Sequence, residues 1–522
     1  MHDFLQRHQQ SVTGMLSGFD RIRFRGTLRL LANAGGMGAF LSYIGVLLKN
    51  FKQYVQEVTE QVRAATVALG EAAGRPLRYL ASPSVNKEEL AREMARRDGI
   101  DEGLICMLSS VEVLWSYDIH RNKKSRMLEL VAASRKCLHY YHYLMHPIFG
   151  FMHVRLATWF PFTMHICING REWLGRQMQS AGIAHQRRDN CFTRIDDLPA
   201  AQELMRLQLC TDWPATLEGL ARQVNPVHEK IFAARPLEYY WSAEQSEWAS
   251  DVMFRDSAAL GRIYPGLVKH GMLSLGSREV MRFLGKRVVA GGGIDRRFKG
   301  VVVSDLVERA EGVRLKHRVN GNSIKMYDKQ GSVLRVETTI NDPRDLKVYR
   351  PKEGDGPDAP MKWRYLRKGV ADLHRRAQVC QSANERYLTA LAAVEEKRAL
   401  GELSAKLCRP TRWKGQSVRA LNPLGEEDAA LLEAVGRGEF VINGLRNQDL
   451  RRLLWGPDPQ DAASRRSRAA AATRKLRLLR AHGLLCKMPK SHRYKVSARG
   501  RLAITALLSA RAADTVKLAA AA

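Results

Sequence analysis

The stretch FMHVRLATWFPFTMHICI, residues 151–168, decides the fold class. Apolar and polar side chains alternate in Phe151–Leu156 and again in Thr163–Ile168. Such alternation predicts strands that each bury one face. The short connector Trp159-Phe160-Pro161-Phe162 lies between the two runs and predicts the end of a hairpin. The sequence therefore predicts an antiparallel strand pair here.

More strands are predicted on either side of this pair. Residues 136–169 as a whole are dense in aromatic and β-branched side chains, and prolines and glycines interrupt them. A strand is predicted at residues 14–30, because arginines alternate there with Ile22 and Phe24. Three further strands are predicted at 313–318, 323–327 and 333–340, because Asn320-Gly321-Asn322 and Gln330-Gly331 between them are typical of hairpin turns.

Helical periodicity predicts the remaining elements. Helices are expected in 37–70, 86–98, 171–180, much of 196–260 and, as one long helix, 363–400. Linkers are predicted at residues 350–361 and 409–424. The fold class we expect is α/β (α+β), with a mixed, largely antiparallel sheet and helical insertions. The predicted domains are 1–195 (α/β), 196–300 (helical), 301–350 (β-rich), 362–408 (long helix and linker) and 424–511.

The last of these domains carries the strongest pattern in the chain. Helices are predicted at 426–437, around Leu450, Leu453 and Leu454, and at 464–482. Two short strands follow at 484–488 and 493–496, and a closing helix comes after them. This order of elements resembles a winged helix-turn-helix, in which the third helix enters the major groove of DNA.

Positive charge is concentrated on the third helix and on the predicted wing. Residues 445–501 hold 16 Lys and Arg against three Asp. A buried stripe of Ala469, Ala472, Leu476 and Leu479 leaves the helix arginines free to reach phosphates or base edges. The alternative is a protein-docking domain with a solvated basic face. The predicted nucleic-acid-binding residues in this domain are Arg466, Arg474, Arg477, Arg480, Lys487, Lys490 and Arg493.

The whole chain is strongly basic. Its 522 residues include 84 Lys and Arg and 53 Asp and Glu, a formal net charge of +31, which favours a polyanionic partner such as DNA or RNA. A basic membrane-surface helix is the competing reading. The sequence has no apolar run long enough for a transmembrane helix and no secretory signal pattern, so a cytoplasmic protein is expected.

Several other classes are excluded by motif. The eight cysteines form no C-x-x-C pair, which argues against a zinc ribbon and a disulfide framework. Gly35-Gly36-Met37-Gly38 and Gly291-Gly292-Gly293 lack the Lys-Ser/Thr of a phosphate-binding P-loop. Neither G-x-S-x-G nor H-E-x-x-H occurs.

Alternation along the three strands predicted within 313–340 gives this group one apolar face and one polar face. Arg314, Lys316 and Arg318 share a side of the first strand and are further predicted nucleic-acid-binding residues. Lys325 and Tyr327 share a side of the second strand, and Arg335 and Glu337 share a side of the third. A face that holds lysine, arginine, tyrosine and glutamate together is costly unless it is solvated or binds a ligand.

The same stretch carries a local resemblance. Ile324-Lys325-Met326-Tyr327-Asp328-Lys329 followed by Leu334-Arg335-Val336-Glu337 is similar to a YDK…LRxE pattern of replication initiators from rolling-circle plasmids and filamentous phages. The resemblance implies a nicking enzyme whose tyrosine attacks a DNA phosphodiester with help from a divalent metal. This chain departs from the nickase pattern of two histidines alternating on one strand, because His153 and His165 lie on different predicted strands.

The resemblance assigns roles to a small set of residues. Tyr327 is the candidate nucleophile, with Tyr140, Tyr141 and Tyr143 as rivals, and Lys325, Arg335 and Arg155 would steady the phosphate. Asp20, Glu337, His153 and His165 would hold Mg²⁺ or Mn²⁺. Each has a structural alternative: Asp20 and Glu337 in ion pairs, the tyrosines in an aromatic core, and the histidines as hydrogen-bonded polar groups.

The function we expect is nucleic-acid binding in a plasmid or mobile element. The enzymatic version is a DNA replication initiator, or a transposase-like metal-dependent nicking or strand-transfer enzyme. The alternative is a non-catalytic DNA- or RNA-binding protein, either a regulator or a ribonucleoprotein component.

Overall fold

The computed structural model describes residues 1–82, 84–285, 301–309, 312–352, 359–392, 400–437, 440, 444–488 and 491–513. The chain forms two compact units. Unit 1 comprises Met1–Met15, Ser250–Thr338 and Cys380–Ala522, and unit 2 comprises Leu16–Ala249 and Thr339–Val379. Four elements run through the boundary between them: β1 (Val12–Thr27), β9 (Tyr240–Phe254), β13 (Val333–Ile340) and α11 (Leu373–Leu391).

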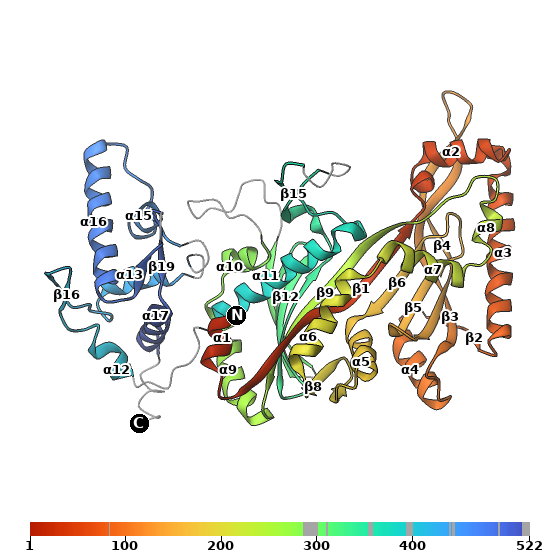
Figure 1. Cartoon of the computed structure of the whole chain (residues 1–522). Coiled ribbons are helices and arrows are strands. Elements are labelled where there is room, and N and C mark those ends of the chain that lie inside the picture. Colours follow the sequence, from red (N-terminus) through yellow and green to blue (C-terminus); the bar gives the residue numbers. More distant parts are fainter. Residues whose placement is uncertain are drawn as a thin grey trace. The chain divides into compact units, whose positions relative to one another are not determined.

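Unit 2 contains a largely antiparallel sheet with helices packed on it (Figure 1). Its remaining elements are η1 (Arg29–Ala32), α2 (Ala34–Tyr43), η2 (Leu48–Asn50), α3 (Phe51–Ala72), β2 (Leu77–Tyr79), α4 (Lys87–Arg97), β3 (Gly103–Arg121), β4 (Leu128–His146), β5 (Gly150–Ala157), β6 (Met164–Asn169), α5 (Gly170–Ser180), β7 (His185–Arg188), β8 (Cys191–Ile195), α6 (Leu198–Leu207), η3 (Gln208–Cys210), α7 (Trp213–Val224), α8 (His228–Ile231), η4 (Pro343–Asp345), β14 (Lys347–Arg350), β15 (Lys362–Tyr365) and η5 (Val370–Asp372).

The strand order in unit 2 is β9-β1-β6-β5-β4-β3-β2. The predicted pair is present, because β5 and β6 are antiparallel and place Val154 opposite Ile166. β2 runs parallel to its neighbour, β3. One face of the sheet packs on an aromatic core in which Phe160 contacts Phe40, Tyr54 and Phe232. The end of the β3–β4 hairpin extends past α2 as an orange loop (Figure 1).

Unit 1 contains the second group of strands and the C-terminal elements. Its remaining elements are α1 (His2–Arg7), α9 (Ser257–Leu273), α10 (Ser277–Phe283), β10 (Val302–Arg309), β11 (Gly312–Val319), β12 (Asn322–Lys329), α12 (Leu400–Ala405), β16 (Thr411–Trp413), β17 (Gln416–Val418), α13 (Glu426–Gly436), α15 (Asn447–Trp455), α16 (Ala462–Ala481), β18 (Leu485–Lys487), β19 (Tyr494–Val496) and α17 (Ala498–Arg511). The strand order is β10-β11-β12-β13-β9.

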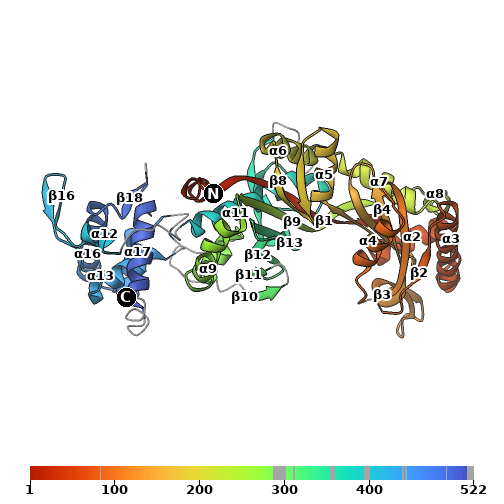
Figure 2. The ribbon, with the colours of Figure 1, turned by 90° about the horizontal axis from the view of Figure 1, so that it is seen from below.

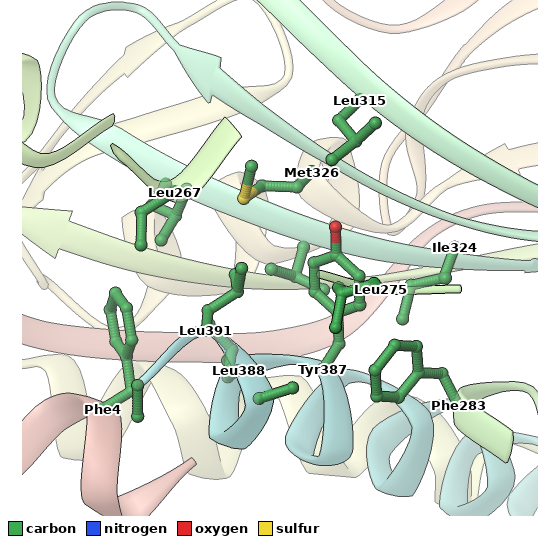
Figure 3. Packing of buried hydrophobic residues seen from close by; sticks show 14 of the residues in the cluster. Phe4, Leu267, Leu275, Phe283, Leu315, Ile324, Met326, Tyr387, Leu388 and Leu391 are labelled. Carbon is green, nitrogen blue, oxygen red and sulfur yellow. The ribbon is translucent and has the colours of Figure 1, made fainter. Parts of the chain in front are cut away.

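Helices cover one face of these strands. Figure 2 shows α9 and α11 beside β11 and β12, and Figure 3 shows the core that they form. Leu315 and Ile324 from the strands meet Leu267, Phe283 and Tyr387 from the helices, and each of these side chains is buried. The predicted apolar face is confirmed, and the opposite face carries the charged side chains.

Residues 400–513, here called the C-terminal module, have a core of their own. Leu432 on α13, Leu450 on α15 and Leu476 on α16 are buried in it with Val496 on β19. From α13 onward, the described elements α13, α15, α16, β18, β19 and α17 follow the predicted order of helices, a two-stranded hairpin and a closing helix. The mixed, largely antiparallel α/β fold class is confirmed.

Three sequence predictions are wrong. The helical region 196–300 contains the strand β9, in which Ser246, Ser250 and Asp251 are fully buried, so alternating apolar periodicity is absent. The long helix over 363–400 begins only at Leu373, because residues 362–365 form β15. The linker 409–424 contains the hairpin β16–β17, which turns through Lys414 and Gly415 with φ of 50° and 76°.

Candidate nucleic-acid interface

The exposed face of α16 gathers two of the predicted arginines. Asp461 begins the helix by accepting a hydrogen bond from the Ser464 amide at 2.7 Å. Ala472, Leu476 and Leu479 are buried, so the opposite side of the helix faces solvent. Arg466 and Arg474 are exposed there, and the small side chains Ala463, Ser467 and Ala470 lie between and beside them. A helix surface of arginines around short side chains can approach a phosphate backbone closely.

Two further arginines of α16 lie against aromatic rings. The guanidinium carbons of Arg477 and Arg480 are 5.8 Å and 5.0 Å from the ring centroid of Trp413 on β16. Arg480 also lies 5.7 Å from the Tyr494 ring, and Arg477 donates a hydrogen bond to Gln416. Such cation–π contacts restrict the arginines without neutralising them. Figure 1 shows β16 beside the lower part of α16.

Trp413 was missed by the sequence analysis. The available signal was Arg412-Trp413-Lys414-Gly415, a tryptophan between two cations and before a glycine suited to a tight turn. Between this hairpin and α16 lies a groove of about 430 Å³, lined by Arg419, Arg474, Lys475, Arg477 and others. Glu427 also lines it and pairs with Lys475 at 2.5 Å. Positive charge remains in excess in the groove.

The predicted wing is only partly described. Lys487 at the end of β18 is exposed. Arg493 is half-buried and donates to the Gly444 carbonyl at 3.3 Å, so it also ties the wing to the preceding turn. Lys490 lies outside the described residues.

The polar face of β11 and β12 in unit 1 is basic, as predicted. Lys316 pairs directly with Lys325 across the two strands, and Arg314 pairs with Tyr327. Burial, together with the charges of Lys325, Arg314 and Arg318, lowers the pKa of Lys316 from its usual value. Arg318 is balanced in part by Asp305 at 3.7 Å. A face with several neighbouring cations attracts an anion.

Tyr327, Lys325 and Glu337 come together next to this face, as predicted. The Tyr327 hydroxyl donates to Glu337 Oε2 at 2.9 Å, and Lys325 Nζ lies 2.6 Å from Glu337 Oε1. Tyr327 and Glu337 are buried. A carboxylate that accepts from a phenol can take its proton, and the neighbouring ammonium can neutralise charge.

Arg335 is not placed to steady a phosphate. Its guanidinium donates to both carboxylate oxygens of Asp251, at 2.6 Å and 2.8 Å, and both side chains are fully buried. The arrangement is a bidentate internal ion pair. The phosphate role predicted for Arg335 is therefore replaced by a structural one.

In unit 2, His153, Arg155 and His165 share one sheet face, because His153 pairs with Cys167 and Arg155 with His165. Arg155 contacts Glu112 at 2.9 Å, and Tyr141 donates to the same carboxylate at 2.5 Å. Burial opposes ionisation of Glu112, but these two partners lower its pKa. Arg155 thus belongs to a second tyrosine–carboxylate cluster, which includes one of the rival tyrosines.

The two histidines are neutral polar groups in this face. Burial lowers the pKa of His153 to about 4 and also lowers that of His165. His165 Nε2 lies 3.4 Å from Glu244, and this hydrogen bond, with Arg23 and Arg25 nearby, lowers the pKa of Glu244 to about 2. Among the described residues, neither histidine belongs to a group of three His, Cys, Asp or Glu side chains whose ligand atoms lie within 4.8 Å.

Asp20 lies on β1, in the part of that strand that belongs to unit 2. The Asp20 carboxylate accepts from Asn190 at 2.9 Å and 3.2 Å, and Arg171 is 3.9 Å away. The ion-pair interpretation of Asp20 fits these contacts. His153 and His165, which were predicted to share a metal with Asp20 and Glu337, lie on the sheet face that holds Arg155.

Comparison with known proteins adds no relative: no family model, curated protein or solved structure matches this chain. Among the described helices, none is long and apolar enough to cross a membrane.

Proposed function

We propose that this chain is a nucleic-acid-binding protein that contacts duplex DNA through α16 and the hairpins of the C-terminal module. One observation carries the proposal: the solvent face of α16 presents Arg466 and Arg474 around Ala463, Ser467 and Ala470. Arginine binds phosphate and guanine in a bidentate manner, and short side chains let the helix approach the groove. The net charge of +31 supports the same partner.

The test is fluorescence anisotropy of the full chain with labelled duplex DNA. Arg466→Ala/Arg474→Ala should weaken binding at least about tenfold, because each lost charged contact contributes on the order of 1 kcal/mol. The matched control is Arg194→Ala/Arg206→Ala, which removes two arginines of unit 2 whose side chains are 67% and 63% exposed. Equal affinities of the two double variants would disprove the assignment of α16.

A second candidate function is phosphodiester cleavage by Tyr327, and the contact between its hydroxyl and Glu337 favours it. In the proposed step the phenol gives its proton to Glu337 and its oxygen bonds to phosphorus. The bond from phosphorus to one sugar oxygen breaks, and that oxygen takes up the proton held by Glu337 and leaves as a hydroxyl. Lys325 supplies a positive charge beside Glu337 during this step.

A denaturing gel with end-labelled single-stranded and supercoiled DNA tests this candidate. Mg²⁺ or Mn²⁺ is added in one arm and EDTA in the other, which tests the predicted metal requirement. Tyr327→Phe and Glu337→Gln should abolish nicking and covalent labelling of the protein. Tyr141→Phe is the matched control, because Tyr141 also donates to a carboxylate. Loss in Tyr141→Phe alone would transfer the role to the Glu112 cluster.

Binding without cleavage on every substrate would leave the non-catalytic protein as the function. In that case a regulator is distinguished from a ribonucleoprotein component by sequencing the nucleic acid that copurifies with the full chain. The proposed origin in a plasmid or mobile element rests on the YDK…LRxE resemblance alone.

A further inference from the structure

The β14–β15 hairpin of unit 2 exposes three large aromatic side chains on one face. Tyr349, Trp363 and Tyr365 are 54%, 68% and 59% exposed. Tyr349 pairs with Trp363 and Lys347 pairs with Tyr365 across the strands, so all four side chains point to the same side. Val348 and Arg350 occupy the other side and are buried. We call Lys347, Tyr349, Trp363 and Tyr365 the aromatic face.

The rings of this face lie close to one another and to a lysine. The centroids of Tyr349 and Trp363 are 5.7 Å apart with their planes tilted by 55°. Lys347 Nζ lies 5.1 Å from the centroid of Tyr365. A cross-strand aromatic pair stabilises a hairpin whether its outer surface faces solvent or a bound partner. Hairpin stability alone therefore does not explain why the rings are exposed. Three open rings beside a lysine are unusual for a surface that has no ligand.

The charge around the aromatic face selects the kind of partner. Residues 344–368 hold eight Lys and Arg against four Asp and Glu. Bases of a single strand expose their flat faces for stacking, whereas those of a duplex are covered by their neighbours. Aromatic rings interleaved with cations are the combination that binds single strands without sequence preference.

A cavity adjoins the hairpin. Its volume is about 360 Å³, and Arg350 and Pro351 at the end of β14 form part of its wall. Tyr239, Tyr240 and Trp241 supply aromatic surface. Small-molecule sites occupy ≈ 300–1,000 Å³, so this cavity lies at the small end and suits one nucleotide.

The cavity wall is also cationic. Asp372 accepts from Arg375 at 2.9 Å and lies 3.6 Å from Arg350, so one carboxylate is shared by two guanidinium groups. Lys352 and Arg367 line the same cavity and add further positive charge. A phosphate attached to a bound nucleoside would meet this excess.

We propose that the aromatic face stacks successive bases of a single-stranded nucleic acid and that the adjoining cavity takes one further nucleotide. This inference goes beyond the proposed duplex binding, because the aromatic face belongs to unit 2 and α16 to unit 1. The surface binds DNA and RNA strands through the same chemistry.

The experiment measures anisotropy of the full chain with labelled oligothymidylate and oligouridylate. Trp363→Ala/Tyr365→Ala should weaken binding at least about tenfold, because stacking on one ring contributes ≈ 1–3 kcal/mol per base. Trp363→Phe should stay within about threefold of the wild type, since a ring is retained. The control is Trp115→Ala, which removes a 72% exposed tryptophan of β3.

A second variant keeps the hairpin rings. Lys347→Gln/Lys352→Gln should lower the slope of log K against log salt by about 0.7 for each lost phosphate contact. It therefore tests the site even if the alanine variant unfolds the hairpin.

Duplex binding is measured in the same samples to keep the two proposals apart. Trp363→Ala/Tyr365→Ala should bind duplex DNA as tightly as the wild type does. Arg466→Ala/Arg474→Ala should retain most of its affinity for single strands. The inference is overturned if the wild type binds neither oligonucleotide, or if Trp363→Ala/Tyr365→Ala and Lys347→Gln/Lys352→Gln both bind like the wild type. Equal loss of duplex and single-strand binding in Trp363→Ala/Tyr365→Ala, with no change in Lys347→Gln/Lys352→Gln, also overturns it.

Discussion

At the scale of single residues, the ion pair between Arg335 and Asp251 is the most deeply buried charge in the strands of unit 1, with no exposed side-chain surface on either partner. Arg335→Met should lower the free energy of unfolding by about 3–5 kcal/mol, because it removes the guanidinium that makes two hydrogen bonds to the buried carboxylate of Asp251. Arg335→Met/Asp251→Leu should recover most of that loss. Urea unfolding followed by circular dichroism gives both values.

The exposed pair of Arg206 and Glu203 is the control for this prediction. Arg206→Met should cost less than about 1 kcal/mol, as is usual for surface pairs. A cost for Arg335→Met as small as that for Arg206→Met would contradict the structural role of Arg335.

His317 gives a pH dependence at the same scale. Its ring is fully buried between Ser304, at 2.7 Å, and Tyr387, at 3.1 Å, and burial lowers its pKa to about 4. The unfolded chain binds a proton near the ordinary pKa, so stability is fully present above pH ~6.5 and is lost as the pH falls toward ~4.

In His317→Gln the unfolded chain no longer takes up a proton at this position. The free energy of unfolding should therefore fall less steeply as the pH is lowered, by at most ~1.4 kcal/mol per pH unit. Denaturant midpoints measured across that pH range test it. His120→Gln changes an exposed histidine, and its stability should depend on pH as that of the wild type does. An unchanged slope in His317→Gln would show that another group causes the acid sensitivity.

Local periodicity explains which of these residues could be predicted. The contact of Lys325 with Glu337 follows from strand alternation and short turns, which the sequence contains within 13 residues. The partner of Arg335 is 84 residues away in the chain, and no pattern in either segment specifies the pairing. Sequence alone therefore identified the polar face but not the burial of Arg335.

At the scale of elements, the errors occur in strands that are short or that contain small and polar side chains. In β9, buried serines and alanines stand where β-branched residues would favour a strand. The residue types therefore indicate a helix, although the segment pairs as a strand. In β15, the alternation of Lys362-Trp363-Arg364-Tyr365 covers only four residues, too few to distinguish a strand from the start of the following helix. Tertiary pairing decides both cases.

The β16–β17 hairpin leads to a prediction at this scale. Trp413→Ala removes the ring beside Arg477 and Arg480, and each cation–π contact is worth ≈ 0.5–1 kcal/mol at an exposed site. Duplex binding should weaken about three- to tenfold, because both arginines gain freedom that binding must again restrict. Anisotropy with the same duplex measures the change.

Trp413→Phe is the companion variant and should bind within about twofold of the wild type. If Trp413→Ala and Trp413→Phe bind duplex DNA equally, the hairpin does not position the arginines. Circular dichroism of both variants checks that they keep the helix content of the wild type.

At the scale of the whole molecule, a charge of +31 makes binding to any polyanion depend on salt, so affinity alone does not locate the interface. The slope of log K against log salt does, because it counts the phosphates released from their counterions. Arg466→Ala/Arg474→Ala/Arg477→Ala should lower the duplex slope by about 2.7, or 0.9 for each contact. Arg194→Ala/Arg206→Ala should leave the slope unchanged although the net charge also falls. A slope that follows net charge in both variants would mean that duplex binding is spread over the whole surface rather than concentrated on α16.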